Sequence, residues 1–353
     1  MQSVYYCQTS QFNSFLTKLT EDYKVFCPRE KNSNKDKNDY CYSALSKGSD
    51  FVYNPYRALE PLKTFFTPPL EKVTDYFTPN KDAIVTDEKV VLFGVKNCDI
   101  YGHKIQDFVF LEGVEVDASY RLRRGNAIFI SSDCTDYKDV CHCLAWDILP
   151  YPEAGFDLNL SILGDGFLVE VGSTKGEDLI KRYKDYFCAA KDTQILARKA
   201  KREALSAKLR KHILSQDLVA KDTVQHLVKA GYNAETWKSF MLTCVECGGC
   251  NLICDTCHCF LLADKKVNSC NEKIRVWDSC LYANYARVAG GANPLKTRAS
   301  RLRNRFMKKF DFFVDNLNMP ACCGCGRCIE VCPGKIDIRE VLKDLRSKLK
   351  KTL

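Results

Sequence analysis

The sequence lacks the features that mark several large classes of protein. No stretch of roughly 18 residues is both apolar and free of charge, so we expect no membrane span. The first residues, MQSVYYCQTS, contain no basic segment followed by an apolar run, and we expect a soluble protein of the cytoplasm. With 46% hydrophobic, 27% charged and 11% aromatic residues, the composition is globular, which excludes a disordered, collagen-like or coiled-coil chain.

Motifs that bind nucleotides or hydrolyse peptides are also missing. There is no G-x-G-x-x-G after a predicted strand, no P-loop and no H-E-x-x-H, and the five histidines form no acid-base pair. Lys and Arg exceed Asp and Glu by only 53 to 44, which falls short of a nucleic-acid-binding surface. The sequence offers no site for a nicotinamide, a flavin or a substrate, and we expect a non-catalytic protein.

Cysteine is the abundant residue, with 21 copies in 353 residues. Disulfide-rich scaffolds are short and secreted, and neither property applies to this chain. In a reducing compartment, clustered cysteines bind metal more often than they pair with one another. The sequence therefore predicts metal centres.

Two cysteine runs near the C-terminus have the C-x2-C-x2-C-x3-C spacing of bacterial ferredoxins. The first three thiolates of such a run reach one [4Fe-4S] cluster, whereas the fourth points away and serves the neighbouring cluster. The runs are Cys244, Cys247, Cys250 and Cys254, and Cys322, Cys325, Cys328 and Cys332. We therefore predict one cluster on Cys244, Cys247, Cys250 and Cys332, and a second on Cys322, Cys325, Cys328 and Cys254.

Two other metal centres compete with this interpretation. Pairs of C-x2-C also build four-cysteine zinc sites in small interaction modules. The segment from Cys254 to His258 has the C-x-x-C-H pattern of covalent haem attachment, but it requires Cys254, which the ferredoxin spacing already uses. Two runs of four with the same spacing favour iron-sulfur clusters over both alternatives.

The first half of the chain has the pattern of an α/β unit. Short apolar strands are predicted at 89–95 and 127–131, and the segments 156–163 and 167–171 flank a Gly-Asp-Gly turn typical of a hairpin. Helices are predicted at 11–26, 100–110, 175–187, 189–214 and 296–310, and a loop at 28–50. The fold class predicted is α+β, with an α/β domain at 1–190, a helical connector at 191–240 and a cysteine-rich domain at 241–353.

Four further cysteines form a candidate third site. Cys98 and Cys134 each follow a predicted strand, and ligands of open α/β sheets bind at the carboxyl ends of the strands. Cys141 and Cys143 come shortly after, so the four thiols are expected to converge and to hold a third iron-sulfur cluster, with Asp99 as a substitute ligand. The alternative is that these cysteines are buried as small apolar side chains, which is common for free thiols.

Nine cysteines have no assigned ligand role. Cys257 and Cys259 lie close enough to the first run for a supporting or exchange role. The others are expected to be structural or incidental: Cys7, Cys27, Cys41, Cys188, Cys270, Cys280 and Cys323. The basic stretches 191–211 and 296–309 are expected to be solvated helix faces, with docking of an acidic redox partner as the alternative.

Several motifs, in order along nearly the whole chain, resemble those of a known family. They are Val91-Leu92-Phe93-Gly94-Val95 before Cys98-Asp99, Cys134 with Cys141-His142-Cys143, Leu168-Val169-Glu170-Val171-Gly172-Ser173, Thr256-Cys257-His258-Cys259-Phe260, Trp277-Asp278-Ser279-Cys280, Ala289-Gly290-Gly291, and Gly324-Cys325-Gly326-Arg327-Cys328. In these motifs the sequence resembles the iron-sulfur β subunits of sulfhydrogenase-type cytoplasmic [NiFe] hydrogenases and, more distantly, the A subunit of anaerobic sulfite reductase.

The resemblance implies an α-helical ferredoxin-type dicluster domain, a third cluster on the four N-terminal cysteines, and an electron-transfer subunit of a cytoplasmic multi-subunit oxidoreductase. Such a subunit relays single electrons between a flavin- or NAD(P)-handling subunit and a catalytic metal subunit such as a hydrogenase. A sulfite reductase relay and a zinc-stabilised interaction module are the alternatives. The family usually has proline where Asp255 stands, and a carboxylate there is expected to lower the potential of the neighbouring cluster.

Overall fold

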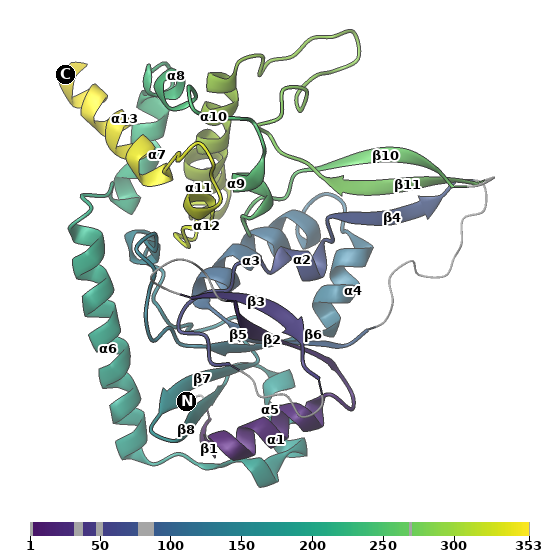
Figure 1. Cartoon of the computed structure of the whole chain (residues 1–353), viewed down its shortest axis with the longest axis vertical. Helices are drawn as coiled ribbons and strands as arrows, with labels where there is room; N and C mark the ends of the chain where they lie inside the picture. Colours follow the sequence, from purple (N-terminus) through teal and green to yellow (C-terminus); the bar gives the residue numbers. More distant parts are fainter. Residues whose placement is uncertain (1–2, 32–37, 47–51, 77–87, 268–269, 353) are drawn as a thin grey trace.

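The computed structural model describes residues 3–31, 38–46, 52–76, 88–267 and 270–352, and Figure 1 shows the arrangement of their helices and strands. The strands are β1 (Val4–Gln8), β2 (Lys24–Lys31), β3 (Asp39–Ala44), β4 (Leu70–Asp75), β5 (Val90–Val95), β6 (Ala127–Ser132), β7 (Leu158–Leu163), β8 (Gly166–Val171), β9 (Cys188–Ala189), β10 (Phe260–Val267) and β11 (Cys270–Trp277). The α-helices are α1 (Thr9–Leu19), α2 (Lys63–Phe66), α3 (Asn97–Leu111), α4 (Ala118–Asn126), α5 (Thr174–Arg182), α6 (Asp192–Leu214), α7 (Lys221–Ala230), α8 (Thr236–Phe240), α9 (Gly249–Leu252), α10 (Arg298–Met307), α11 (Phe313–Leu317), α12 (Arg327–Glu330) and α13 (Ile338–Thr352). Shorter turns are η1 (Cys143–Trp146), η2 (Lys184–Tyr186) and the π-helical η3 (Lys308–Phe312).

Eight strands form one mixed sheet in the order β3-β2-β5-β6-β7-β8-β1-β9. Strands β2, β5, β6 and β7 run parallel to one another, so their carboxyl ends meet at one edge. The remaining pairs are antiparallel, including the β7–β8 hairpin. The strands predicted at 89–95 and 127–131 and the predicted hairpin are confirmed, as is the mixed α and β composition.

Helices cover both faces of this sheet because residues of the central strands alternate between two cores. Val91 and Phe93 of β5 pack with residues of α1 and α5, whereas Leu92 and Val95 pack with residues of α3 and α4. The alternation breaks at Gly94, where the register between β5 and β6 shifts. In Figure 1, α1 and α5 lie on one side of the sheet and α3 and α4 on the other.

The long helix α6 runs from the sheet to a group of helices that includes α7, α8, α10 and α13 (Figure 1). Leu209 and Ile213 of α6 share a hydrophobic core with residues of these helices, such as Trp237 and Phe306. The same core contains cysteines of the second run and of the candidate third site, for example Cys322 and Cys143. The helix predicted at 189–214 is confirmed as α6. No helix among the described residues is long and apolar enough to cross a membrane.

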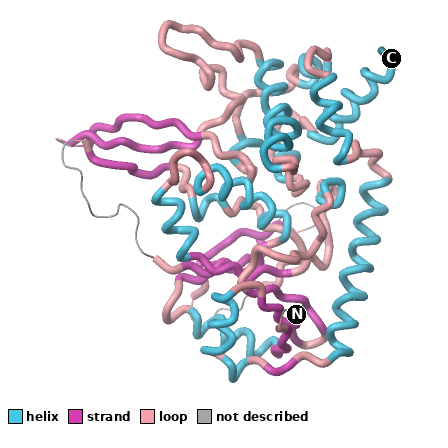
Figure 2. Tube along the Cα trace, turned by 180° about the vertical axis from the view of Figure 1, so that it is seen from behind, coloured by secondary structure: helices cyan, strands magenta, loops and turns pink. Residues whose placement is uncertain are grey.

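A small second sheet, in the order β10-β11-β4, joins distant parts of the sequence. The β10–β11 hairpin lies between the two cysteine runs, and β4 from the first predicted domain pairs with β11 over residues 70–75 and 272–276. Figure 2 shows this sheet standing out from the side of the molecule. The cysteine-rich third therefore contains strands as well as helices, and an α-helical ferredoxin type is not confirmed.

The predicted loop at 28–50 is wrong in its described parts. Residues up to Lys31 belong to β2, and Asp39–Ala44 form β3, which pairs antiparallel with β2. Tyr40 is buried and packs edge-on against Tyr56, so an aromatic face stabilises a strand that the Lys- and Asn-rich composition conceals. Residues 32–37 and 47–51 lie outside the described residues. The helix predicted at 11–26 ends at Leu19, before β2 begins.

Candidate metal centres

The first candidate centre is a cavity lined by cysteines of both runs. These are Cys244, Cys247, Cys250 and Cys332, and Cys328 also reaches the same cavity. Cys250 lies in α9, a single turn that begins after Gly248 in the left-handed backbone region. Burial raises the pKa of the Cys250 thiol, and the nearby Cys332 contributes in the same direction. The structure thus brings together the four cysteines predicted for one cluster, including the crossed ligand.

The second set of cysteines gathers around Cys328. Three thiols lie close enough to raise its pKa electrostatically: Cys254, Cys322 and Cys325. Burial is the largest cause and raises the pKa of Cys328 to about 12, and burial likewise raises that of Cys322 to about 11. An iron ion overrides such shifts because it coordinates the deprotonated thiolate.

Lys309 connects the two runs at this second set. Its Nζ lies 3.4 Å from the Sγ of Cys254 and donates hydrogen bonds to the Thr256 hydroxyl at 2.8 Å and the Ala321 carbonyl at 3.1 Å. The pKa of Cys254 lies well below its usual range. A hydrogen bond from Cys257 is the largest cause, and the positive charge of Lys309 also lowers this pKa, whereas burial raises it. The end of the first run and the start of the second therefore share one buried cation. Covalent haem attachment would need Cys254, but this cysteine lies among the thiols of the second run.

The third candidate centre is a cavity lined by all four N-terminal cysteines: Cys98, Cys134, Cys141 and Cys143. Cys98 lies in the first turn of α3 directly after β5, and Cys134 follows β6, its parallel neighbour. Cys325 of the second run lines the same cavity. The sheet edge therefore collects the thiols as the strand order predicts.

A buried arginine faces this third group with unused hydrogen-bonding capacity. Arg57 lines the cavity and is 1% exposed; its Nε donates to the Cys325 carbonyl at 2.9 Å, and its Nη2 pairs with Glu330. Its Nη1 has no hydrogen-bond partner within the described ranges. A buried N–H group without a partner is costly, and an anionic cluster with sulfide and thiolate acceptors would satisfy it. The residues present therefore fit an iron-sulfur cluster.

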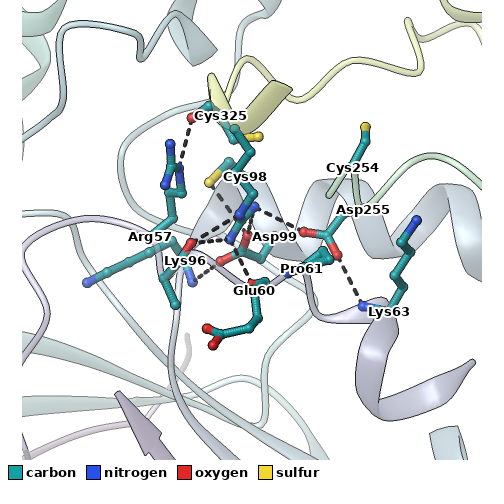
Figure 3. A network of polar contacts seen from close by, with 12 residues as sticks. Arg57, Glu60, Pro61, Lys63, Lys96, Cys98, Asp99, Cys254, Asp255 and Cys325 are labelled. Atoms are coloured by element: carbon teal, nitrogen blue, oxygen red, sulfur yellow. Dashed lines mark hydrogen bonds and ion pairs between the residues drawn. The ribbon is translucent and has the colours of Figure 1, made fainter. Parts of the chain in front are cut away.

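Asp99 and Asp255 both form ion pairs with Arg327. The Nη1 atom of Arg327 lies 2.7 Å from a carboxylate oxygen of Asp99 and 3.1 Å from one of Asp255. Figure 3 shows both carboxylates in this buried network, where Asp255 also accepts a hydrogen bond from the Lys63 backbone N–H at 3.1 Å. The substitute-ligand role expected for Asp99 therefore has no support in the structure. Asp255 instead forms an ion pair with the Arg327 guanidinium.

The basic stretch 296–309 is not the solvated face that the sequence suggests. Arg301, Arg305 and Lys309 recur at helical spacing and are only 3%, 5% and 4% exposed. Charged side chains are rarely buried unless they are paired. Arg301 pairs with Glu246, whereas Arg305 and Lys309 indicate anionic neighbours inside the protein. Sequence reasoning missed this role, and the available signal was the i, i+4, i+8 spacing of the three cations.

The thiols in each set are spread around a cavity. Within the described residues, no three His, Cys, Asp or Glu side chains converge closely enough to hold a single metal ion. A zinc site needs its four ligands around one ion, whereas a cubane cluster binds each thiolate at a different iron.

Comparison with known proteins identifies the class first. Residues 243–336 match the family model of the 4Fe-4S dicluster domain, which covers both cysteine runs. The chain is thus an iron-sulfur electron-transfer protein with two [4Fe-4S] clusters. Over 340 residues it is 31% identical to the sulfhydrogenase 2 subunit beta of Pyrococcus furiosus, an alignment that covers 96% of this chain and 97% of that protein. The chain belongs to this family of iron-sulfur β subunits, which confirms the resemblance seen in its motifs.

Proposed function

We propose that the protein is the electron-relay subunit of a cytoplasmic multi-subunit oxidoreductase, passing single electrons between a flavin- or NAD(P)-handling subunit and a catalytic metal subunit such as a hydrogenase. It performs no bond-making chemistry itself. The observation that carries the proposal is the continuity of the three cysteine groups. Cys328 of the second group also lines the first cavity, and Cys325 also lines the third. Three clusters held this way stand in a row.

The ligand assignment follows the three groups. One [4Fe-4S] cluster takes Cys244, Cys247, Cys250 and Cys332, the next takes Cys254, Cys322, Cys325 and Cys328, and a third iron-sulfur cluster takes Cys98, Cys134, Cys141 and Cys143. The cavity linings, the mutual charge effects of the thiols and the unpartnered Arg57 Nη1 support this assignment. We also propose a division of the chain into three parts, at 1–190, 191–240 and 241–353. The pairing of β4 with β11 connects the first part to the last.

The two ends of the row differ in the surface they offer to partners. At the first cluster, Cys247 is exposed, and Leu242 and Val245 beside it are 81% and 65% exposed. At the third, Cys134 borders an opening lined by basic residues of α6, including Lys201 and Lys208. The apolar end suits a permanent neighbour in a hetero-oligomer, and the basic end suits an acidic redox partner.

Anaerobic purification of the complex tests the proposal directly. The tagged chain should co-purify with a flavin- or NAD(P)-binding subunit and a metal-containing catalytic subunit, and Val245→Glu should weaken that association. The exposed Val114 serves as the matched control, because Val114→Glu adds the same charge in the α3–α4 connection, which lines neither the first nor the third cavity. Co-purification with a sulfite-reducing subunit would instead favour the relay subunit of an anaerobic sulfite reductase. A colourless protein with zinc and no acid-labile sulfide would overturn the relay.

A further inference from the structure

A fourth cavity collects three cysteines that the relay does not use. It is lined by Cys257, Cys259 and Cys280, together with His258. Asn251 holds two of these thiols: its Nδ2 lies 3.2 Å from the Sγ of Cys280, and its Oδ1 accepts from Cys257 at 3.6 Å. The Tyr285 hydroxyl donates to the Sγ of Cys259 at 3.4 Å. All three sulfurs are therefore oriented by polar neighbours.

The β10–β11 hairpin explains how the three cysteines meet. Phe260 and Trp277 are partners in the hairpin register, so Cys259, just before β10, and Cys280, three residues after β11, come to the same end. The Asp278 N–H donates to the Cys259 carbonyl at 2.9 Å and closes that end. The hairpin thus places Cys280 close to the first cysteine run, although more than 20 residues separate them along the chain.

The cavity is rich in positive charge. Arg305, Lys308 and Lys309 line it with the thiols, and two of them are nearly fully buried. The Nη2 atom of Arg305 is buried and has no hydrogen-bond partner among the residues described. Buried cations require anionic partners, and thiolates bound to a cluster would supply that charge.

We propose that Cys257, Cys259 and Cys280, with His258 as the fourth ligand, hold an additional [4Fe-4S] cluster. Three thiolates on a cubane give an anion complementary to the cations that line this cavity. The Nδ1 of His258 lies 3.2 Å from the Thr256 carbonyl. A hydrogen bond donated there places the proton on Nδ1 and leaves the Nε2 lone pair for iron.

This site goes beyond the proposed relay, which needs only the other three groups. It lies directly beside the second group, because Lys309 lines this cavity and its Nζ lies 3.4 Å from the Sγ of Cys254. The additional cluster would therefore exchange electrons with the middle of the row and form a branch.

Iron and acid-labile sulfide counts on the anaerobically purified full chain test the site. The double variant Cys259→Ser with Cys280→Ser should lose about four iron atoms and about four sulfides per chain relative to the unmodified protein. The control variant Cys41→Ser with Cys188→Ser also removes two free thiols and should lose none. Unchanged iron in the double variant overturns the site, as does a Cys259–Cys280 disulfide found by mass spectrometry in the unmodified chain.

Pulsed electron paramagnetic resonance on the reduced, intact protein gives a second readout that does not depend on how the cysteine variants fold. A histidine-ligated cluster should show a strongly coupled imidazole nitrogen, which His258→Ala should abolish and His226→Ala on α7 should keep. A spectrum of the unmodified protein without this coupling overturns the histidine ligand. Failure of the relay would instead leave all iron in place without electron exchange between subunits, so the two failures are distinguishable.

Discussion

Gly324 lies so close to Cys143 that a Cβ atom on it would stand 2.6 Å from the Cα of Cys143. The His142 N–H donates to the Gly324 carbonyl at 2.8 Å, so the second cysteine run and the Val140–Cys143 segment pack backbone to backbone. Gly324 also has a φ of +65°, a conformation that side chains disfavour. This contact brings Cys325 to the wall of the third cavity, and it places the second and third groups next to each other.

Substitution of Gly324 by alanine should therefore be unusually destabilising. The left-handed backbone costs an alanine about 1–2 kcal/mol, and the overlap with the Cys143 backbone adds about 1–3 kcal/mol. The matched control is Gly164→Ala, because Gly164 has a φ of +62° and, among the described residues, no atom within 4 Å of the place a Cβ would take, so only the first cost applies. Anaerobic thermal unfolding should show a larger fall in Tm for Gly324→Ala. Equal falls would contradict the backbone contact.

The crossed ligands give a prediction that separates the two C-terminal clusters. Cys254→Ser should disturb the cluster of Cys322, Cys325 and Cys328 and leave the cluster of its own sequence neighbours intact. Cys332→Ser should have the reverse effect, because Cys332 lines the first cavity. Redox-resolved electron paramagnetic resonance of the two variants is the measurement. Loss of the sequence-adjacent cluster in either variant would refute the crossed arrangement.

The parts of the site that sequence reasoning reached are those governed by local spacing or by strand direction. The x2-x2-x3 spacing places the fourth cysteine on another face, and parallel strands carry Cys98 and Cys134 to one edge. The pairing of β4 with β11 joins segments about 200 residues apart and leaves Leu70 and Val73 exposed, so no local pattern predicts it. The burial of Arg305 and Lys309 was missed because a buried and a solvated basic stretch have the same composition, and only the four-residue spacing of these cations distinguished them.

Asp255 provides a test of charge beside the second cluster. Its carboxylate pairs with Arg327, and Asp255→Asn keeps the shape but removes the negative charge. We expect the free energy of unfolding to fall by about 1–3 kcal/mol, because a buried charge-assisted hydrogen bond is weakened, and the potential of the second cluster to rise. Asp311→Asn is the control, since Asp311 is also buried but pairs with Lys229. Redox titration should show a shift for the first variant only; equal potentials would mean that Arg327 already neutralises Asp255.

The iron held by the third group of cysteines should be removable without loss of the other clusters. Cys141→Ser with Cys143→Ser in the full chain should remove about four iron atoms and leave the spectra of both C-terminal clusters. Cys7→Ser with Cys27→Ser is a demanding control, because both residues are fully buried in the core of the eight-stranded sheet and line none of the metal cavities described above. Iron content equal to that of the unmodified chain after removal of Cys141 and Cys143 would show that these thiols are only core residues.

Removal of iron should unfold the cysteine-rich part of the molecule more than the large sheet. Cysteines of the second and third groups belong to the same hydrophobic core as α6, α7, α10 and α13, and buried Arg305 and Lys309 lose their anionic partners when the clusters leave. Metal binding is then part of the folding free energy of this region, whereas the core between the sheet, α1 and α5 contains none of the proposed ligands. Anaerobic chelation should lower the helical signal in circular dichroism and retain the strand signal, and iron with sulfide should restore the helices. Full helicity in the iron-free protein would show that packing alone holds this region.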